Sequence, residues 1–202
     1  DRLRSLYARG SVFVTLQATM VASGLLAFRP DFFALWTHGD IPYDPLLATE
    51  WVLGTSVIAP SILALVYANY SNRGDLLART KGLQLAVFLL LSALLIQPMG
   101  PLGAAIAVVA SDLLIQFGLL GIIIIRQTLQ RPFQHVGFLA AIMILVTSGG
   151  WALGMIARSW VPGTGPVSLA SECMIWLIVV ALVASPLAQA SLRNRLIAAI
   201  PR

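Results

Sequence analysis

Charged residues are scarce in this chain of 202 residues: only 10% are Asp, Glu, Lys or Arg, whereas 58% are hydrophobic. A soluble globular domain has about 25% charged residues, so the composition excludes that class. Cys173 is the single cysteine, so no disulfide can form within the chain, and we expect it to be a small buried residue. The two histidines, His38 and His135, lie in separate polar segments. We therefore expect no metal site and no cofactor.

The motifs of membrane-bound enzymes are also missing. The sequence has no HExxH motif and no pair of aspartates within its apolar runs. An intramembrane serine protease would need a histidine base at membrane depth, and neither histidine lies in an apolar run. We expect no enzymatic activity and no catalytic residue. The net charge of +5 comes from cations at the ends of apolar runs, so nucleic acid is not an expected partner.

Apolar runs make up most of the sequence. A helical crossing of a bilayer needs about 20 apolar residues, and six runs approach or exceed that length. They are approximately residues 10–28, 46–68, 82–98, 102–125, 136–157 and 173–192. Continuous apolar runs favour helices over barrel strands, which would alternate between apolar and polar residues. We therefore predict an all-α, polytopic membrane protein with six transmembrane helices in one domain, residues 1–202.

The cations fall on alternate sides of these runs. Eleven lie in the first, third, fifth and seventh polar segments, namely Arg2, Arg4, Arg9, Arg73, Arg79, Lys81, Arg126, Arg131, Arg193, Arg195 and Arg202. Only Arg29 and Arg158 lie in the even-numbered segments. Because Lys and Arg are retained on the cytoplasmic side, this asymmetry predicts that both termini are cytoplasmic.

Glycine and proline predict where the helices turn, bend and approach one another. Residues 97–101 should form a tight external turn, which joins the third and fourth spans as a hairpin. Pro60 and Pro186 should bend the second and sixth spans. Gly103 and the Gly150–Gly154 pair indicate close helix contacts.

Asp112 stands near the middle of the fourth predicted span, where a carboxylate costs about 2.5–3.5 kcal/mol. It should face the bundle interior together with Gln116, which lies one helical turn further on. Two interpretations stay open. Asp112 belongs to a proton or cation site, or it forms an interhelical hydrogen-bond clamp with Gln84 or Gln17.

Two further sets of polar residues are candidates for a site. Arg29 and Arg158, the external cations, could contact an anionic substrate, or they could simply extend to the lipid headgroups. Thr15, Thr19 and Ser23 recur about once per turn in the first span and are candidates for lining a cavity.

The order of features in residues 25–114 resembles the C-terminal half of polysaccharide and lipopolysaccharide flippases. These proteins belong to the multidrug/oligosaccharidyl-lipid/polysaccharide exporter superfamily. The resembling elements are Phe28-Arg29-Pro30-Asp31, Leu35-Trp36, Gly39, Tyr43, Asn72-Arg73-Gly74, and Pro98-Met99-Gly100-Pro101-Leu102-Gly103-Ala104-Ala105-Ile106-Ala107 followed by Ser111. The matched residues are architectural, and none is transferred as a substrate ligand.

The resemblance implies a transporter of the bacterial inner membrane with two helical lobes around a central cavity that opens alternately to each side. The six spans of this chain would correspond to the last six of a 14-helix member. The implied substrate is a lipid-linked oligosaccharide, and the chain would be the C-terminal part of a longer protein. Membrane lipids and glycan-synthesis proteins are the other expected partners. Two alternatives stay open: a cation-coupled multidrug exporter of the same superfamily, and a noncatalytic scaffold of a glycan-synthesis complex.

Overall fold

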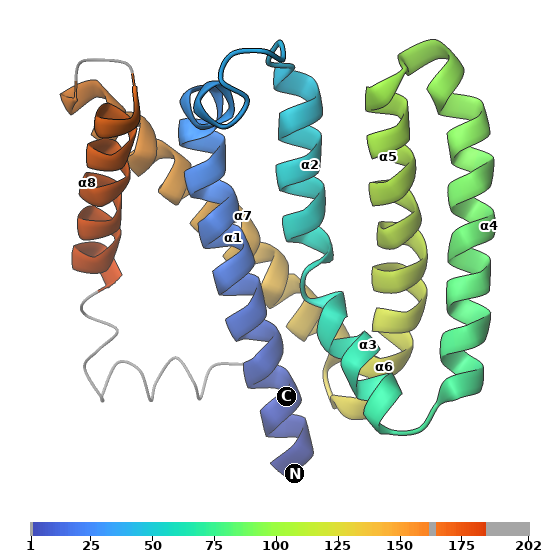
Figure 1. Ribbon diagram of the computed structural model, residues 1–202. Helices are drawn as coiled ribbons and strands as arrows, with labels where there is room; N and C mark the ends of the chain where they lie inside the picture. Colours follow the sequence, from blue (N-terminus) through green and yellow to red (C-terminus); the bar gives the residue numbers. More distant parts are fainter. Residues whose placement is uncertain (1, 162–164, 185–202) are drawn as a thin grey trace.

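The structure, a computed structural model, describes residues 2–161 and 165–184, and these residues form helices without any strand. The helices are α1 (Arg2–Trp36), α2 (Pro45–Ile58), α3 (Ser61–Tyr70), α4 (Gly74–Met99), α5 (Pro101–Ser111), the π-helix η1 (Asp112–Gly121), α6 (Ile122–Thr128), α7 (Pro132–Trp160) and α8 (Pro166–Ala184). Figure 1 shows α8, α1, α2, α5 and α4 side by side, and α7 crosses behind α1. The all-helical prediction is confirmed for the described residues.

Four helical segments are long and apolar enough to cross a membrane alone: α1, α4, α7 and the continuous segment Pro101–Thr128, which joins α5, η1 and α6. The bent pair α2 and α3 is long and apolar enough only when taken together, so the described residues contain four such segments, or five if this pair is one span. The apolar part of α8, Pro166–Leu182, is shorter, and the rest of the sixth predicted span lies outside the described residues, as does Pro186. These apolar helices indicate a membrane-embedded protein, whereas the sixth crossing and the orientation stay predictions.

The surface of α4 has the character expected of a helix in lipid. None of the 18 residues in the most apolar stretch of α4 is buried inside the protein. Leu89, Leu90 and Leu94 are exposed, although each is a large apolar side chain. In water such a surface would mark an interaction site, but hydrocarbon solvates it without penalty.

Proline and glycine shape the spans largely as predicted. The axes of α2 and α3 differ by 46° at a break that contains Pro60. The turn between α4 and α5 is narrower than expected, because α4 continues through Pro98 to Met99. Gly100 then reverses the chain with φ of 58° and ψ of −132°, a conformation that only glycine adopts readily. The hairpin is tight: a Cβ on Gly103 would overlap the backbone carbonyl of Leu95, which confirms the close contact predicted there.

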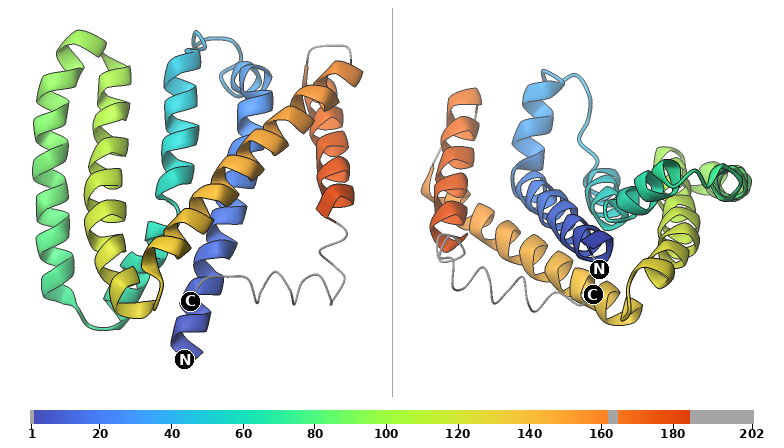
Figure 2. Two further views of the ribbon diagram at one scale, coloured as in Figure 1. Left: turned by 180° about the vertical axis from the view of Figure 1, so that it is seen from behind. Right: turned by 90° about the horizontal axis from the view of Figure 1, so that it is seen from below.

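The most extensive contact between two helices of the described residues is that of α1 with α7, and Figure 2 shows α7 running diagonally across α1. A Cβ on Gly150 would overlap Ser23, and one on Gly154 would overlap Ala27. The indole Nε1 of Trp176 in α8 donates a hydrogen bond of 2.9 Å to the carbonyl of Gly150. The glycine pair therefore allows α1, α7 and α8 to meet with their backbones close together.

The hydroxyl stripe of α1 is part of this contact and does not line a cavity, so that prediction was wrong. Thr15, Thr19 and Ser23 are at most 1% exposed. Each hydroxyl donates to a carbonyl of its own helix, at 2.7 Å in each case, which removes the need for water. Ser11 extends the stripe by one turn and lies 2.8 Å from Nε2 of His135, which is buried in the first turn of α7 and not in a loop.

Candidate functional site

Five polar side chains from α3, α4 and η1 form one hydrogen-bonded network within the membrane-spanning helices. The Lys81 ammonium donates to Gln84 Oε1 at 2.8 Å and to Gln116 Oε1 at 2.5 Å. Gln84 Nε2 donates to the Asp112 carboxylate, and Gln116 Nε2 donates to Ser61 Oγ at 2.9 Å. The network thus joins a cation and an anion through the amide of Gln84, and it ties three helical segments together.

The directions of these hydrogen bonds are fixed by the partners at the ends. An ammonium can only donate and a carboxylate can only accept, so the amide of Gln84 must direct its oxygen to Lys81 and its nitrogen to Asp112. Gln116 has the same arrangement, with its oxygen toward Lys81 and its nitrogen toward Ser61. Each of the two amides therefore uses its oxygen and its nitrogen.

The proline break explains why Ser61 is available. In a regular helix the carbonyl of Ile58 would accept from the backbone N–H of Ile62, but that N–H donates to Ala59 at 3.1 Å. The Ser61 hydroxyl donates to the Ile58 carbonyl at 2.7 Å, so the carbonyl keeps a partner. The oxygen of Ser61 then accepts from Gln116. The bend in the second span thus places an acceptor for the polar network.

Asp112 is the first residue of η1 and Gln116 lies in its first turn. A π-helix of ten residues is rare, and π segments occur frequently at functional sites. Beside the network lies a cavity of about 320 Å³, whose polar walls are Lys81, Gln84, Ser111 and Asp112. An ionic network, a π-helix and a cavity meet at one point of the transmembrane region.

The structure brings together three of the four predicted intramembrane polar residues, Gln84, Asp112 and Gln116. Gln17 is elsewhere: it is an exposed residue of α1 and lies at the edge of a groove between α1 and α2. Sequence reasoning missed Lys81, which was counted only as a cytoplasmic end residue, and Ser61. The spacing of three residues between Lys81 and Gln84 was the available signal, because it places both on one face of a helix.

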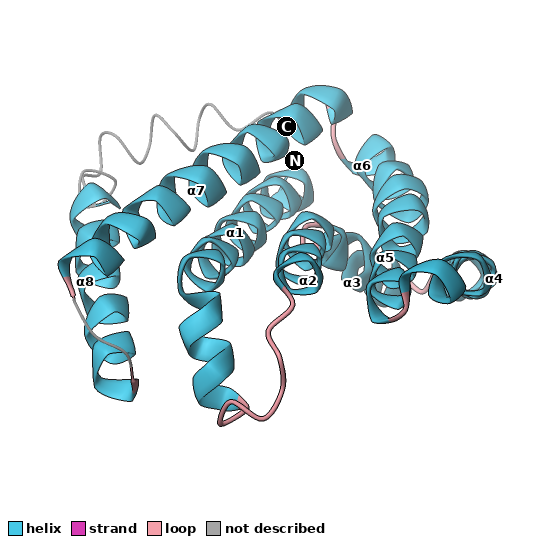
Figure 3. Cartoon of the chain, turned by 90° about the horizontal axis from the view of Figure 1, so that it is seen from above, coloured by secondary structure: helices cyan, strands magenta, loops and turns pink. Residues whose placement is uncertain are grey.

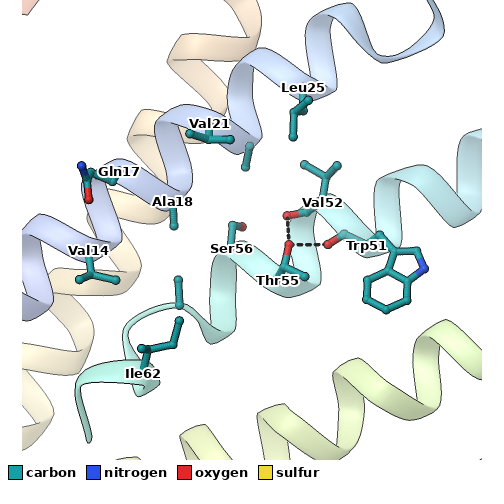
Figure 4. A pocket seen from close by; sticks show the side chains of 12 residues that line it. Val14, Gln17, Ala18, Val21, Leu25, Trp51, Val52, Thr55, Ser56 and Ile62 are labelled. Atoms are coloured by element: carbon teal, nitrogen blue, oxygen red, sulfur yellow. Dashed lines mark hydrogen bonds between the residues drawn. The ribbon is translucent and has the colours of Figure 1, made fainter. Parts of the chain in front are cut away.

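A second feature is an apolar groove of about 680 Å³ between α1 and α2 (Figure 4). On α1 it is lined by Val14, Ala18, Val21, Ala22 and Leu25 together with Gln17; on α2 and beyond it is lined by Trp51, Val52, Thr55, Ser56, Ala59 and Ile62. The two hydroxyls in the wall are occupied, since Thr55 and Ser56 donate to carbonyls of α2. The groove therefore offers an apolar surface of the size of a ligand pocket.

Arg29 lies one helical turn beyond Leu25, at the end of this groove. Its guanidinium donates to the hydroxyl of Thr49 on α2, which links the two helices beyond the residues that line the groove. Burial raises the pKa of the nearby Tyr43 phenol, and the positive charge of Arg29 opposes this effect. Among the residues that the structure describes, no carboxylate forms an ion pair with Arg29. Its charge is therefore available to an anion.

Arg158, the other predicted anion contact, has a different environment. Its Nη2 lies 2.6 Å from Oδ2 of Asp31, so a carboxylate already neutralises it. Glu172 of α8 is 3% exposed and accepts a hydrogen bond of 3.4 Å from Ser168. The two arginines thus differ: Arg29 donates to Thr49 beyond the end of the groove, whereas Arg158 links α7 to α1.

Within residues 2–161 and 165–184, no group of three or more His, Cys, Asp or Glu side chains could hold a metal ion. The candidate site consists of the polar network around Lys81 and the apolar groove between α1 and α2, with Arg29 one helical turn beyond it. Comparison of the chain with protein-family models, curated proteins and solved structures found no match.

Proposed function

We propose that this protein transports a lipid-linked oligosaccharide across the bacterial inner membrane. The observation that carries the proposal is the apolar groove along α1 that ends at an arginine without a carboxylate partner. A lipid-linked oligosaccharide combines a long apolar chain with a phosphate group. The groove suits the chain, because the residues of α1 that line it from Val14 to Leu25 are apolar, with the exception of Gln17.

The phosphate would bind at Arg29. A guanidinium offers several donors in a planar arrangement that matches phosphate oxygens, and Thr49 adds a hydroxyl beside it. The bend at Pro60 and the π-helix η1 give the spans two points at which they can change shape, as alternating access requires. The resemblance of residues 25–114 to polysaccharide flippases supports the same substrate class.

A second candidate is a cation-coupled multidrug exporter. One observation favours it: Asp112 is a carboxylate in the transmembrane region, and it lies in a network with Lys81 beside a cavity. Ionisable residues at this depth commonly mark ion pathways. The two candidates differ in substrate and in their need for a cation gradient.

Replacing Arg29 by Gln in the full-length protein should reduce flipping of a lipid-linked oligosaccharide by roughly 10–100-fold, because a charge-assisted hydrogen bond contributes about 1.5–3 kcal/mol. The measurement uses proteoliposomes that contain a polyprenyl-pyrophosphate oligosaccharide, and an impermeant glycosidase detects the sugars that reach the outer leaflet. Arg29→Lys, which retains the charge but not the planar donors, should be intermediate.

Arg79→Gln is the matched control, because it removes one exposed cation near the start of α4, far from the groove. It should leave flipping unchanged. If the wild-type protein does not accelerate flipping but moves lipophilic drugs in response to a cation gradient, the exporter is the correct function. If it does neither, the scaffold interpretation replaces both.

A further inference from the structure

Lys81 is the only lysine in the sequence, and its ammonium points into the polar network instead of toward bulk water. Lysine side chains near span ends normally extend to the headgroup region, where the ammonium is hydrated. Here the ammonium is bound by the side chains of Gln84 on the same helix and Gln116 on η1. The positive-inside rule explains why a cation lies at this end of the span, but it does not explain why the ammonium is bound by two amide side chains.

The surroundings of the ammonium are those of a cation site. Two amide oxygens bind it, Gln84 Oε1 at 2.8 Å and Gln116 Oε1 at 2.5 Å. Neither amide can turn its nitrogen inward without losing its second partner, Asp112 for Gln84 and Ser61 for Gln116. The carboxylate of Asp112 supplies the counter-charge through the amide of Gln84. Oriented oxygen dipoles with a nearby anion are what proteins use to bind Na⁺ and K⁺ in membranes.

We propose that Gln84, Gln116 and Asp112 form a monovalent-cation site in which the ammonium of Lys81 is the resident cation. The lysine thus takes the place of a free ion and holds α3, α4 and η1 together through the network. The wild-type protein therefore needs no Na⁺ or K⁺ at this position. The adjoining cavity of about 320 Å³ gives a small hydrated ion access if the ammonium is removed.

The inference goes beyond the proposed transport function and does not depend on the lipid substrate. The test of the cation site measures thermal stability and not transport. A negative result would therefore not affect the proposal that the groove and Arg29 bind the lipid substrate. Likewise, a protein that flips no oligosaccharide could still contain this site.

The test is the thermal unfolding of full-length Lys81→Met in detergent at pH 7, in sodium, ammonium or choline chloride at equal ionic strength. Methionine keeps an apolar stem of similar length but leaves the ammonium position open. Sodium or ammonium ions should raise the Tm of this variant by roughly 3–6 °C relative to choline at a concentration ten times the dissociation constant. The Tm of the wild-type protein should not differ among the three salts.

The control is the double variant Lys81→Met with Asp112→Asn, which lacks the counter-charge and should show no stabilisation by either ion. The proposal is overturned if neither ion raises the Tm of Lys81→Met relative to choline, or if the same ions raise the Tm of the wild-type protein or of the double variant as much as that of Lys81→Met.

A second measurement applies even if Lys81→Met does not fold. Acetic anhydride should acylate Lys81 of folded Asp112→Asn about tenfold faster than Lys81 of the wild-type protein, as peptide mass spectrometry measures, since loss of the carboxylate weakens the hydrogen-bonded network that holds the Lys81 side chain away from the reagent. Equal rates would show that Asp112 is not the counter-charge of Lys81 and would also overturn the proposal.

Discussion

Asp112→Leu should lower the stability of the protein by about 2 kcal/mol, because it leaves the amide nitrogen of Gln84 without its acceptor and the ammonium of Lys81 without its counter-charge. For a chain of this size, that loss corresponds to a decrease in Tm of roughly 4–8 °C. Thermal unfolding in detergent measures the effect. A leucine variant as stable as the wild-type protein would show that the network contributes nothing to the fold.

Asp112→Asn is the matched control, since asparagine keeps an oxygen that can accept from Gln84 but cannot ionise. We expect this variant to fold and to retain flipping, because the hydrogen bond from Gln84 on α4 to residue 112 on η1 can persist without a negative charge. A stable asparagine variant without transport would instead assign Asp112 to cation coupling and would favour the exporter.

Gly150→Leu should have an effect of similar or greater size. A Cβ at this position already overlaps Ser23 of α1, and the carbonyl of Gly150 accepts the hydrogen bond from Trp176. A leucine would force α1 and α7 apart and cost about 1–3 kcal/mol or more through overpacking. We expect a lower Tm and less folded protein in membranes.

The neighbouring Gly149 provides the control, because a Cβ there would meet nothing within 4 Å. Gly149→Leu should leave the Tm nearly unchanged. In addition, Ser23→Gly should recover part of the stability lost in Gly150→Ala, since it removes the atoms that the new Cβ would contact. If Gly149→Leu and Gly150→Leu change the Tm equally, α1 and α7 do not contact each other at Gly150.

The sequence was sufficient to predict the helices and several of their irregularities. Apolar runs are long enough to specify helices without knowledge of their neighbours, and Pro60 bends its span because proline lacks the N–H that a helix needs. The ends of the spans were less accurate. For example, α1 continues past residue 28, through Pro30, to Trp36. Hydropathy reports where apolar residues stop, whereas helix ends depend on backbone hydrogen bonds that polar residues can also make.

Only part of the polar network could be predicted, because the sequence does not show which helices are neighbours. Helical spacing placed Asp112 and Gln116 together, but spacing within one helix does not tell which neighbouring helix lies opposite. Gln84 and Gln17 were therefore equal candidates, and only the packing of α4 against η1 separates them. Lys81 was missed because the side chain is long enough to start at the end of a span and reach the network. The hydroxyl stripe was misassigned because buried hydroxyls suit a dry helix contact as well as a wet cavity.

The orientation of the chain is the claim on which both functional proposals depend, since it places Arg29 outside and the start of α4, near Lys81, inside. Figure 3 views the molecule from the end that we assign to the outside. At this end lie the loop after α1, the turn at Gly100 and the start of α8, whereas the α3–α4 and α6–α7 connections lie at the opposite end (Figure 1).

The most direct test is the reaction of single cysteines with a membrane-impermeant thiol reagent in intact cells, in a background without Cys173. Cysteines that replace Thr37, Gly100 and Gly165 should be labelled from outside, and those that replace Asp75 and Gln130 should react only after the membrane is made permeable. Labelling of the cysteine at 75 or 130 in intact cells, with protection of the other three, would contradict the account.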